Sequence, residues 1–172
     1  EGADVTVNSG SAHAGAWLND GTLNITGGTF GDVRFRNNGG TIAISGGKFG
    51  TITNHDASST IPLMPLLANG YAFYKDNVVQ DATAKNLTDV TVGAHTHTPD
   101  ENGKCACGAS IIASVKTADG TERTYGSFTD ALAAAVESND STLQLLYDID
   151  LGDTKYGVSV DYGKFTLDLN RK

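Results

Sequence analysis

Short stretches of alternating apolar and polar residues recur through the first 60 positions of the chain. Residues 22–40 (TLNITGGTFGDVRFRNNGG) align without gaps with residues 41–59 (TIAISGGKFGTITNHDASS), and the preceding segment VTVNSGSAHAGAWLNDG is a weaker copy. Alternation at every second position predicts β-strands, and the Gly-Gly pair in each full copy predicts a corner with positive φ. Three copies at a fixed spacing predict a solenoid.

A repeat of about 19 residues with two or three short strands has the size of one rung in a right-handed parallel β-helix. Residues 1–60 therefore predict a mainly β fold that begins with about three such rungs. Equivalent apolar positions in successive copies would form ladders inside the coil. The predicted ladders are Val5-Leu23-Ile42, Val7-Ile25-Ile44 and Phe30-Phe49.

Residues 61–109 lose the repeat and are expected to form a cap and connector. Two prolines interrupt the apolar run IPLMPLL, which disfavours a helix across them. The later pieces YAFY and VTV are strand-like, so Tyr71 and Phe73 would share one strand face. These two aromatic side chains either pack against the end of the repeat stack or, together with Trp17, stack on a sugar ring.

Residues 110–172 predict a β-rich domain with one amphipathic helix. The pieces IIASVKT and ERTYGSF are typical of a hairpin with its turn at Asp119-Gly120. Ser127 is placed to cap a helix over 127–138, whose apolar positions fall on one stripe. The stretches STLQLLYDIDL and KFTLDLN alternate as strands do.

Length and charge limit the organisation and the partners of the chain. Its 172 residues suffice for one medium domain or two small ones, and 12 of the 21 glycines lie within the first 60 positions, which indicates a boundary there. The formal net charge of −8 argues against a nucleic-acid partner, because such proteins concentrate lysine and arginine. No apolar stretch approaches the roughly 18–20 residues of a membrane-spanning helix, so membrane insertion is not expected. Strand patterns run close to both ends and indicate a longer parent chain.

The copies GGTFGDVRFRNNGG and GGTIAISGG resemble the glycine-rich parallel β-helix repeats of large Gram-positive bacterial cell-surface proteins. The segment YGSFTDALAAA, followed by TLQLLYDIDL and TLDLN, is similar to the capping helix and opening strands of a further β-helix in such proteins. This resemblance implies an extracellular location at the cell surface or cell wall. It also implies a role as an adhesin or spacer, with a host or cell-wall glycan or protein as partner.

The segment HTHTPDENGKCAC holds both cysteines and half of the histidines. His95 and His97 are two positions apart, as are Cys105 and Cys107, so each pair would face one side of an extended segment. The intervening TPDENGK is rich in turn formers and predicts a hairpin near Glu101, on which the four side chains converge. Two thiolates and two imidazoles fill a zinc tetrahedron and leave no position for a reactive water. The segment therefore predicts a structural zinc ion that cross-links and stabilises the connector at the domain junction.

Two other interpretations of the cysteines stay open. A disulfide between Cys105 and Cys107 would close a very small, strained ring, although an extracellular setting favours oxidation. The remaining alternative is a pair of thiols that is unrelated to the nearby histidines.

No arrangement of residues indicates catalysis, and the chain is not expected to be an enzyme. Asp148, Asp150 and Asp153 form an acidic stretch, which a solvated strand face explains and which would at most hold calcium weakly. No Ser-His-Asp or Cys-His nucleophile is indicated, and the Gly-Gly pairs lack the following helix of a phosphate loop. The sequence favours a non-catalytic structural or adhesive fragment with a structural zinc site. The alternative is a carbohydrate-binding or carbohydrate-active β-helix module that uses the three aromatic residues named above.

Overall fold

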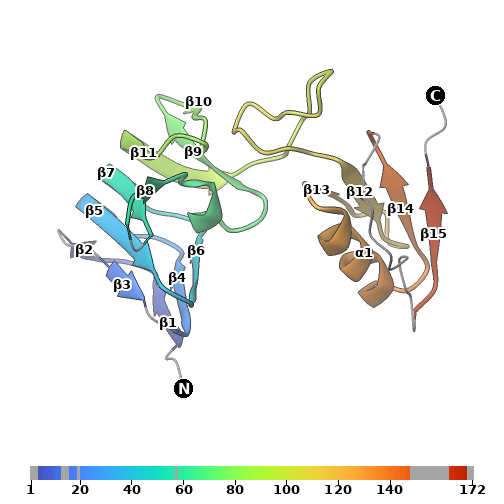
Figure 1. Cartoon of the computed structure of the whole chain (residues 1–172), viewed down its shortest axis with the longest axis horizontal. Coiled ribbons are helices and arrows are strands. Elements are labelled where there is room, and N and C mark those ends of the chain that lie inside the picture. Colours follow the sequence, from blue (N-terminus) through green and yellow to red (C-terminus); the bar gives the residue numbers. More distant parts are fainter. Residues whose placement is uncertain (1–3, 13–15, 19, 57, 148–162, 170–172) are drawn as a thin grey trace. The chain divides into compact units, whose positions relative to one another are not determined.

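The chain is mainly β, with one α-helix among the residues that the structure describes, as the sequence predicts. It divides into two compact units, which are described separately below. The first unit comprises Glu1–His97 and Ala106–Ala109, and the second comprises Thr98–Cys105 and Ser110–Lys172. The computed structural model describes residues 4–12, 16–18, 20–56, 58–147 and 163–169 (Figure 1).

One sheet of the first unit takes a strand from each copy of the repeat. The three strands are parallel, and each residue pairs with its equivalent in the next copy: Val5 with Leu23, and Leu23 with Ile42. This is the register that the alignment of the copies predicts, but Val5 is 47% exposed, so the predicted ladder is not buried at its first position. The strands are β1 (Asp4–Val7), β4 (Thr22–Ile25) and β6 (Thr41–Ile44).

A second sheet of this unit continues the copies and then changes strand direction. Its parallel strands again pair equivalent residues, among them Phe30 with Phe49. After the last copy, β11 (Asn86–Ala94) runs antiparallel to both β7 (Lys48–His55) and β9 (Tyr71–Lys75). The other strands of the sheet are β2 (Ser11–Ala12), β3 (Ala16–Leu18), β5 (Thr29–Asn37), β8 (Thr60–Ile61) and β10 (Val78–Val79).

The described sheets do not close on themselves into a coil, so the structure does not confirm the predicted β-helix. Strands β9 to β11, from the segment expected as cap and connector, extend the second sheet beyond the last copy. The apolar run with two prolines forms only the short 3-10 helix η1 (Met64–Leu66). Leu67, which follows this helix, forms an isolated β-bridge with Ile44 of β6. Strand β7 pairs with β11, so both strands of the last copy pair with segments that come later in the chain. The predicted boundaries at residues 60 and 109 stay predictions.

The two glycines of each Gly-Gly pair have different structural roles. Gly28 and Gly47 have φ angles of 108° and 105°, which confirms the predicted corner. Gly46 lies where the backbones of two copies touch: a Cβ atom there would be 2.1 Å from the carbonyl oxygen of Thr26. The first glycine of the pair therefore permits close stacking, and the second permits the turn.

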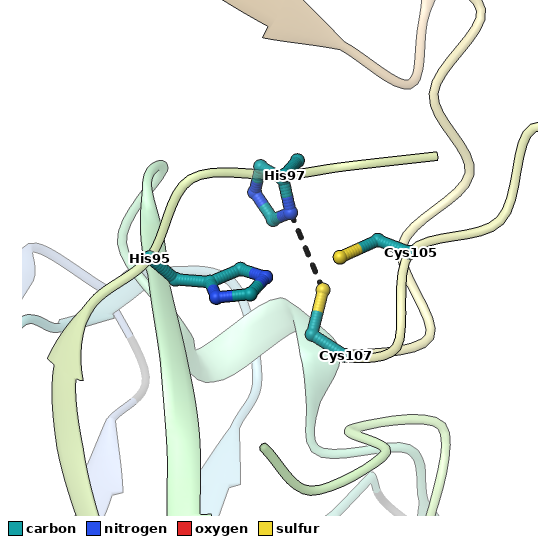
Figure 2. Close-up of side chains that lie close together, drawn as sticks. All are labelled: His95, His97, Cys105 and Cys107. Carbon is teal, nitrogen blue, oxygen red and sulfur yellow. Dashed lines mark hydrogen bonds between the residues drawn. The ribbon is translucent and has the colours of Figure 1, made fainter. Parts of the chain in front are cut away.

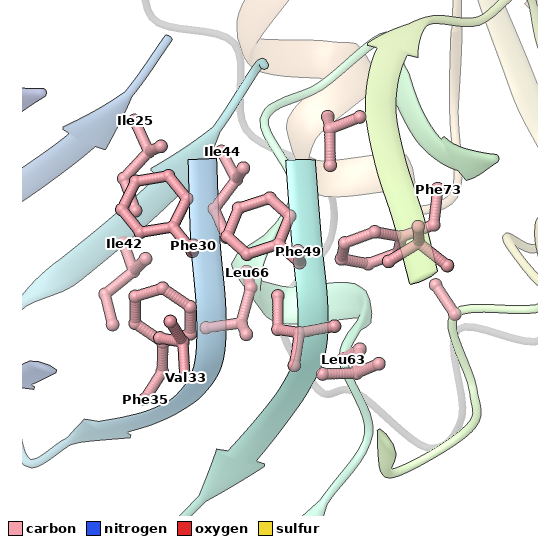
Figure 3. Packing of buried hydrophobic residues seen from close by; sticks show 14 residues of the cluster. Ile25, Phe30, Val33, Phe35, Ile42, Ile44, Phe49, Leu63, Leu66 and Phe73 are labelled. Atoms are coloured by element: carbon pink, nitrogen blue, oxygen red, sulfur yellow. The ribbon is translucent and has the colours of Figure 1, made fainter. Parts of the chain in front are cut away.

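Buried apolar side chains from both sheets form the core of the first unit (Figure 3). Phe30 and Phe49 stack with their ring centroids 4.9 Å apart and an interplanar angle of 9°, as the predicted aromatic ladder requires. Phe73 of β9 is fully buried in the same cluster. Removing this apolar surface from water is the main contribution to the stability of the unit. The other members of the cluster are Ile25, Val33, Phe35, Ile42, Ile44, Ile52, Leu63, Leu66, Ala82, Val90 and Val92.

The second unit is a four-stranded sheet with one helix packed on it, in the strand order β13-β12-β14-β15. The Thr117 amide donates a hydrogen bond to the Thr121 carbonyl across the predicted hairpin turn. Helix α1 (Phe128–Glu137) follows Ser127, whose hydroxyl accepts a hydrogen bond from the Asp130 amide, which confirms the predicted cap. The strands are β12 (Ala113–Lys116), β13 (Glu122–Tyr125), β14 (Ser141–Leu145) and β15 (Phe165–Asp168). Within the described ranges, no helix has both the length and the apolar character needed to cross a lipid bilayer.

Candidate metal centre

Two histidines and two cysteines meet at one place in the structure (Figure 2). The candidate ligand atoms of His95, His97, Cys105 and Cys107 all lie within 4.8 Å of one another. In a zinc tetrahedron with Zn–S near 2.3 Å and Zn–N near 2.0 Å, a nitrogen and a sulfur ligand are about 3.5 Å apart. The Nδ1 atom of His97 and the Sγ atom of Cys107 are already 3.3 Å apart. The four residues therefore converge as the sequence predicts, in an arrangement that is able to hold a metal ion.

The extended segment that follows β11 positions both histidines. The backbone amide of His95 donates a hydrogen bond of 2.8 Å to the carbonyl oxygen of Gly70. His95 and His97 are half-buried, whereas the threonine after each of them is exposed, as expected for residues that alternate along an extended chain. The two cysteines alternate in the same way: their exposed fractions are 5% and 1%, and the alanine between them is exposed.

A tight turn joins the two pairs of ligands. The Asp100 amide donates to the Lys104 carbonyl at 2.8 Å, and Asp100 Oδ1 accepts hydrogen bonds from the amides of Asn102 and Lys104. These hydrogen bonds, chiefly that from Lys104, lower the pKa of the Asp100 carboxyl, so it stays ionised as an acceptor. The predicted hairpin near Glu101 is therefore present as a turn, and the segments flanking it are not β-strands.

The backbone at Cys107 is fixed by the segment that precedes β11. The amide of Ala82, a fully buried residue, donates a hydrogen bond of 2.9 Å to the Cys107 carbonyl. Gly108 follows with a φ angle of 88° and lies so close to Asp81 that a Cβ atom would be 2.2 Å from the Asp81 Oδ1 atom. The sequence predicts a tight turn at Gly108, and the structure shows that a side chain there would also collide with its neighbour.

Burial favours the neutral form of both imidazoles, which is the form that binds a metal. Burial lowers the pKa of His95 below its usual value. Burial also lowers the pKa of His97, and the neighbouring His95 lowers it further, since two imidazolium charges would repel each other at a ring separation of 5.0 Å. A neutral imidazole offers a lone pair to a metal ion. No disulfide joins Cys105 and Cys107.

The aromatic residues of the alternative ligand site do not form one exposed group. Phe73 is fully buried in the core, so the prediction that it contacts a sugar is wrong and the packing interpretation describes it correctly. Tyr71 is partly buried and packs against the same core. Trp17 lies in β3, and its side chain is outside what the structure describes. The acidic residues Asp148, Asp150 and Asp153 lie outside the described residues.

Tyr74 contacts the cluster, although the sequence does not single it out. Its hydroxyl oxygen is 3.1 Å from His95 Nδ1 and 3.0 Å from the carbonyl oxygen of Ala94. Alternation along YAFY does place Tyr74 on the strand face opposite Phe73 and so away from the core. Alternation within β9 does not show that β11 pairs with it. His95 directly follows β11, so the contact between Tyr74 and His95 cannot be predicted from the sequence of β9 alone.

Comparisons of the chain with protein-family models, with curated proteins and with solved structures give no match, so the site is interpreted from its own residues.

Proposed function

We propose that this chain is a non-catalytic structural module that binds one zinc ion through His95, His97, Cys105 and Cys107. The observation that carries the proposal is the convergence of these four ligand atoms within 4.8 Å, with both thiols buried. Two sulfur and two nitrogen ligands suit zinc in closed tetrahedral sites, whereas calcium and magnesium prefer oxygen ligands. Four protein ligands leave no coordination position for a water nucleophile, so the role of the ion is structural.

Zinc would supply stability that the segment between the ligands lacks. Residues 98–104 are exposed or half-buried except for Gly103, and this segment therefore contributes little apolar surface to a core. A metal ion bound by residues on both sides of the turn cross-links the two ends of this segment. The free energy of metal binding then contributes to the free energy of folding.

Elemental analysis of the tag-free protein, purified under reducing conditions, tests this proposal. We expect about one zinc per chain, in keeping with a closed four-ligand site. Cobalt substituted for zinc should give the intense visible absorption of a tetrahedral, sulfur-ligated ion. A chain that takes up no zinc when zinc is supplied, or whose mass is lower by two hydrogens because the cysteines have formed a disulfide, contradicts the proposal.

We further propose that residues 1–60 are rungs of a β-helix in an extracellular bacterial surface protein, where the chain acts as an adhesin or spacer. Strands of successive copies pair in parallel at equivalent residues, and Phe30 stacks on Phe49. Both observations support the proposed β-helix rungs. The parallel pairing of β14 with β15 supports a second β-helix that begins in the second unit. The resemblance of the glycine-rich copies to surface-protein repeats supports the location.

Antibodies raised against the chain test the proposed location on intact cells of the source organism. They should label intact cells about as strongly as lysed cells, because an extracellular segment is accessible without lysis. A cytoplasmic marker labelled in parallel controls for leakage. Labelling that requires lysis would show that the chain is intracellular.

A further inference from the structure

Tyr74 reaches the metal cluster by lying across the neighbouring strand. It belongs to β9, where its backbone pairs with Thr91 of β11, yet its hydroxyl group contacts Ala94 and His95 farther along. The ring passes over Gly93: a Cβ atom there would be 3.6 Å from Tyr74 Cε2 and 3.8 Å from Cδ2. The tyrosine ring therefore lies against the backbone at Gly93.

The hydrogen bonds of Tyr74 determine which nitrogen of His95 carries the proton. A phenol has one proton to donate, and its oxygen can also accept a hydrogen bond. The Ala94 carbonyl can only accept, so the Tyr74 hydroxyl donates to it at 3.0 Å. The contact of 3.1 Å between the Tyr74 oxygen and His95 Nδ1 then requires the imidazole to donate its Nδ1 proton to Tyr74.

This arrangement leaves the Nε2 atom of His95 with its lone pair. In Figure 2, one ring nitrogen of His95 is directed toward the two sulfur atoms and the other is turned away from them. Because Nδ1 is engaged by Tyr74, the nitrogen directed toward the sulfurs is Nε2. His97 differs, since its Nδ1 atom is the one that lies 3.3 Å from Cys107 Sγ.

We propose that Tyr74 is a positioning residue of the metal centre, which selects Nε2 of His95 as the ligand and fixes the orientation of its ring. This inference rests on the proposed zinc-binding function. A group that holds the second nitrogen of a ligating histidine fixes its tautomer and raises its basicity, and loss of such a group weakens metal affinity by about 10- to 100-fold.

Substitution of Tyr74 by phenylalanine tests the inference, because Tyr74→Phe keeps the ring that lies on Gly93 and removes only the hydroxyl. We expect the zinc dissociation constant, measured by competition with a chelating dye, to rise by about 10- to 100-fold. The variant should still bind about one zinc at saturation, since all four ligands remain. Tyr71→Phe removes a hydroxyl from the same strand and should leave the dissociation constant within about twofold of the wild-type value.

Nitrogen NMR of the histidine rings gives a readout that does not depend on how well Tyr74→Phe folds. In the metal-free wild-type protein, His95 should be the Nδ1–H tautomer, and in the zinc form its Nε2 resonance should show metal coordination. Coordination through Nδ1 of His95, or equal zinc affinities for Tyr74→Phe and the wild-type protein, would overturn the inference while leaving zinc binding intact. A wild-type protein that binds no zinc would instead overturn the proposed function and this inference together.

Discussion

Replacing Cys107 with serine should abolish zinc binding and remove the stabilisation that zinc provides. Cys107 is almost fully buried, and its Sγ atom lies 3.3 Å from His97 Nδ1. A serine hydroxyl is smaller, harder and not ionised at neutral pH, and it cannot replace a thiolate as a zinc ligand. At a free zinc concentration about 1,000 times the dissociation constant, binding stabilises the folded wild-type protein by about 4 kcal/mol. Thermal unfolding with added zinc, and again with a chelator, measures this difference.

The metal-free proteins provide the reference for this experiment. With a chelator present, Cys107→Ser and the wild-type protein should unfold within a few degrees of each other, so that the large difference appears only with zinc. Glu101→Ala, an exposed substitution in the same turn, should keep both zinc and the zinc-dependent stability. The assignment of Cys107 as a ligand fails if Cys107→Ser binds zinc as tightly as the wild-type protein.

Replacing Gly46 with alanine should destabilise the first unit by about 3 kcal/mol, at the upper end of what overpacking costs. The new Cβ atom would be 2.1 Å from the carbonyl oxygen and 2.7 Å from the carbonyl carbon of Thr26, and both atoms belong to backbone that cannot rotate away. The copies would have to separate locally. This separation would lengthen the hydrogen bond of 2.8 Å between the Ser45 amide and the Ile25 carbonyl beside the contact. Urea unfolding followed by a probe in the first unit measures the loss.

Gly93→Ala is the matched control, because the strand there has room for a methyl group. The nearest atom to a Cβ at Gly93 is a tyrosine ring carbon at 3.6 Å, an ordinary van der Waals contact. This variant should stay within about 0.5 kcal/mol of the wild-type protein. Equal stabilities for Gly46→Ala and Gly93→Ala would show that the copies are not stacked as closely as the backbone contacts indicate.

The features that the sequence predicts correctly are those determined by spacing along the chain. The repeat places Val5 beside Leu23 and Phe30 beside Phe49, because equivalent positions of successive copies lie on neighbouring strands. The cap at Ser127 follows from residues three positions apart in one segment. The two-residue spacing within each ligand pair likewise requires no knowledge of the rest of the fold.

The features that the sequence does not reveal depend on which distant segments become neighbours. Strand β11 returns antiparallel along β7, and no residue of the repeat encodes that return. Phe73 is buried because β9 pairs with β11 and joins the same core. Tyr74 contacts His95 for the same reason. Each of these outcomes requires the strand order, which a single sequence does not supply.

The antiparallel direction of β11 also has a consequence for self-association. Parallel strands that stack identical positions, such as Phe30 on Phe49 at 4.9 Å, share their geometry with the strands of cross-β fibrils. Such a stack pairs with strands of other molecules wherever the backbone N–H and C=O groups of its last strand are unpaired. The edge of β7 is occupied by a strand of opposite direction and different sequence. The repeat is therefore terminated on that side, and the first unit is protected there from fibril growth by its own later chain.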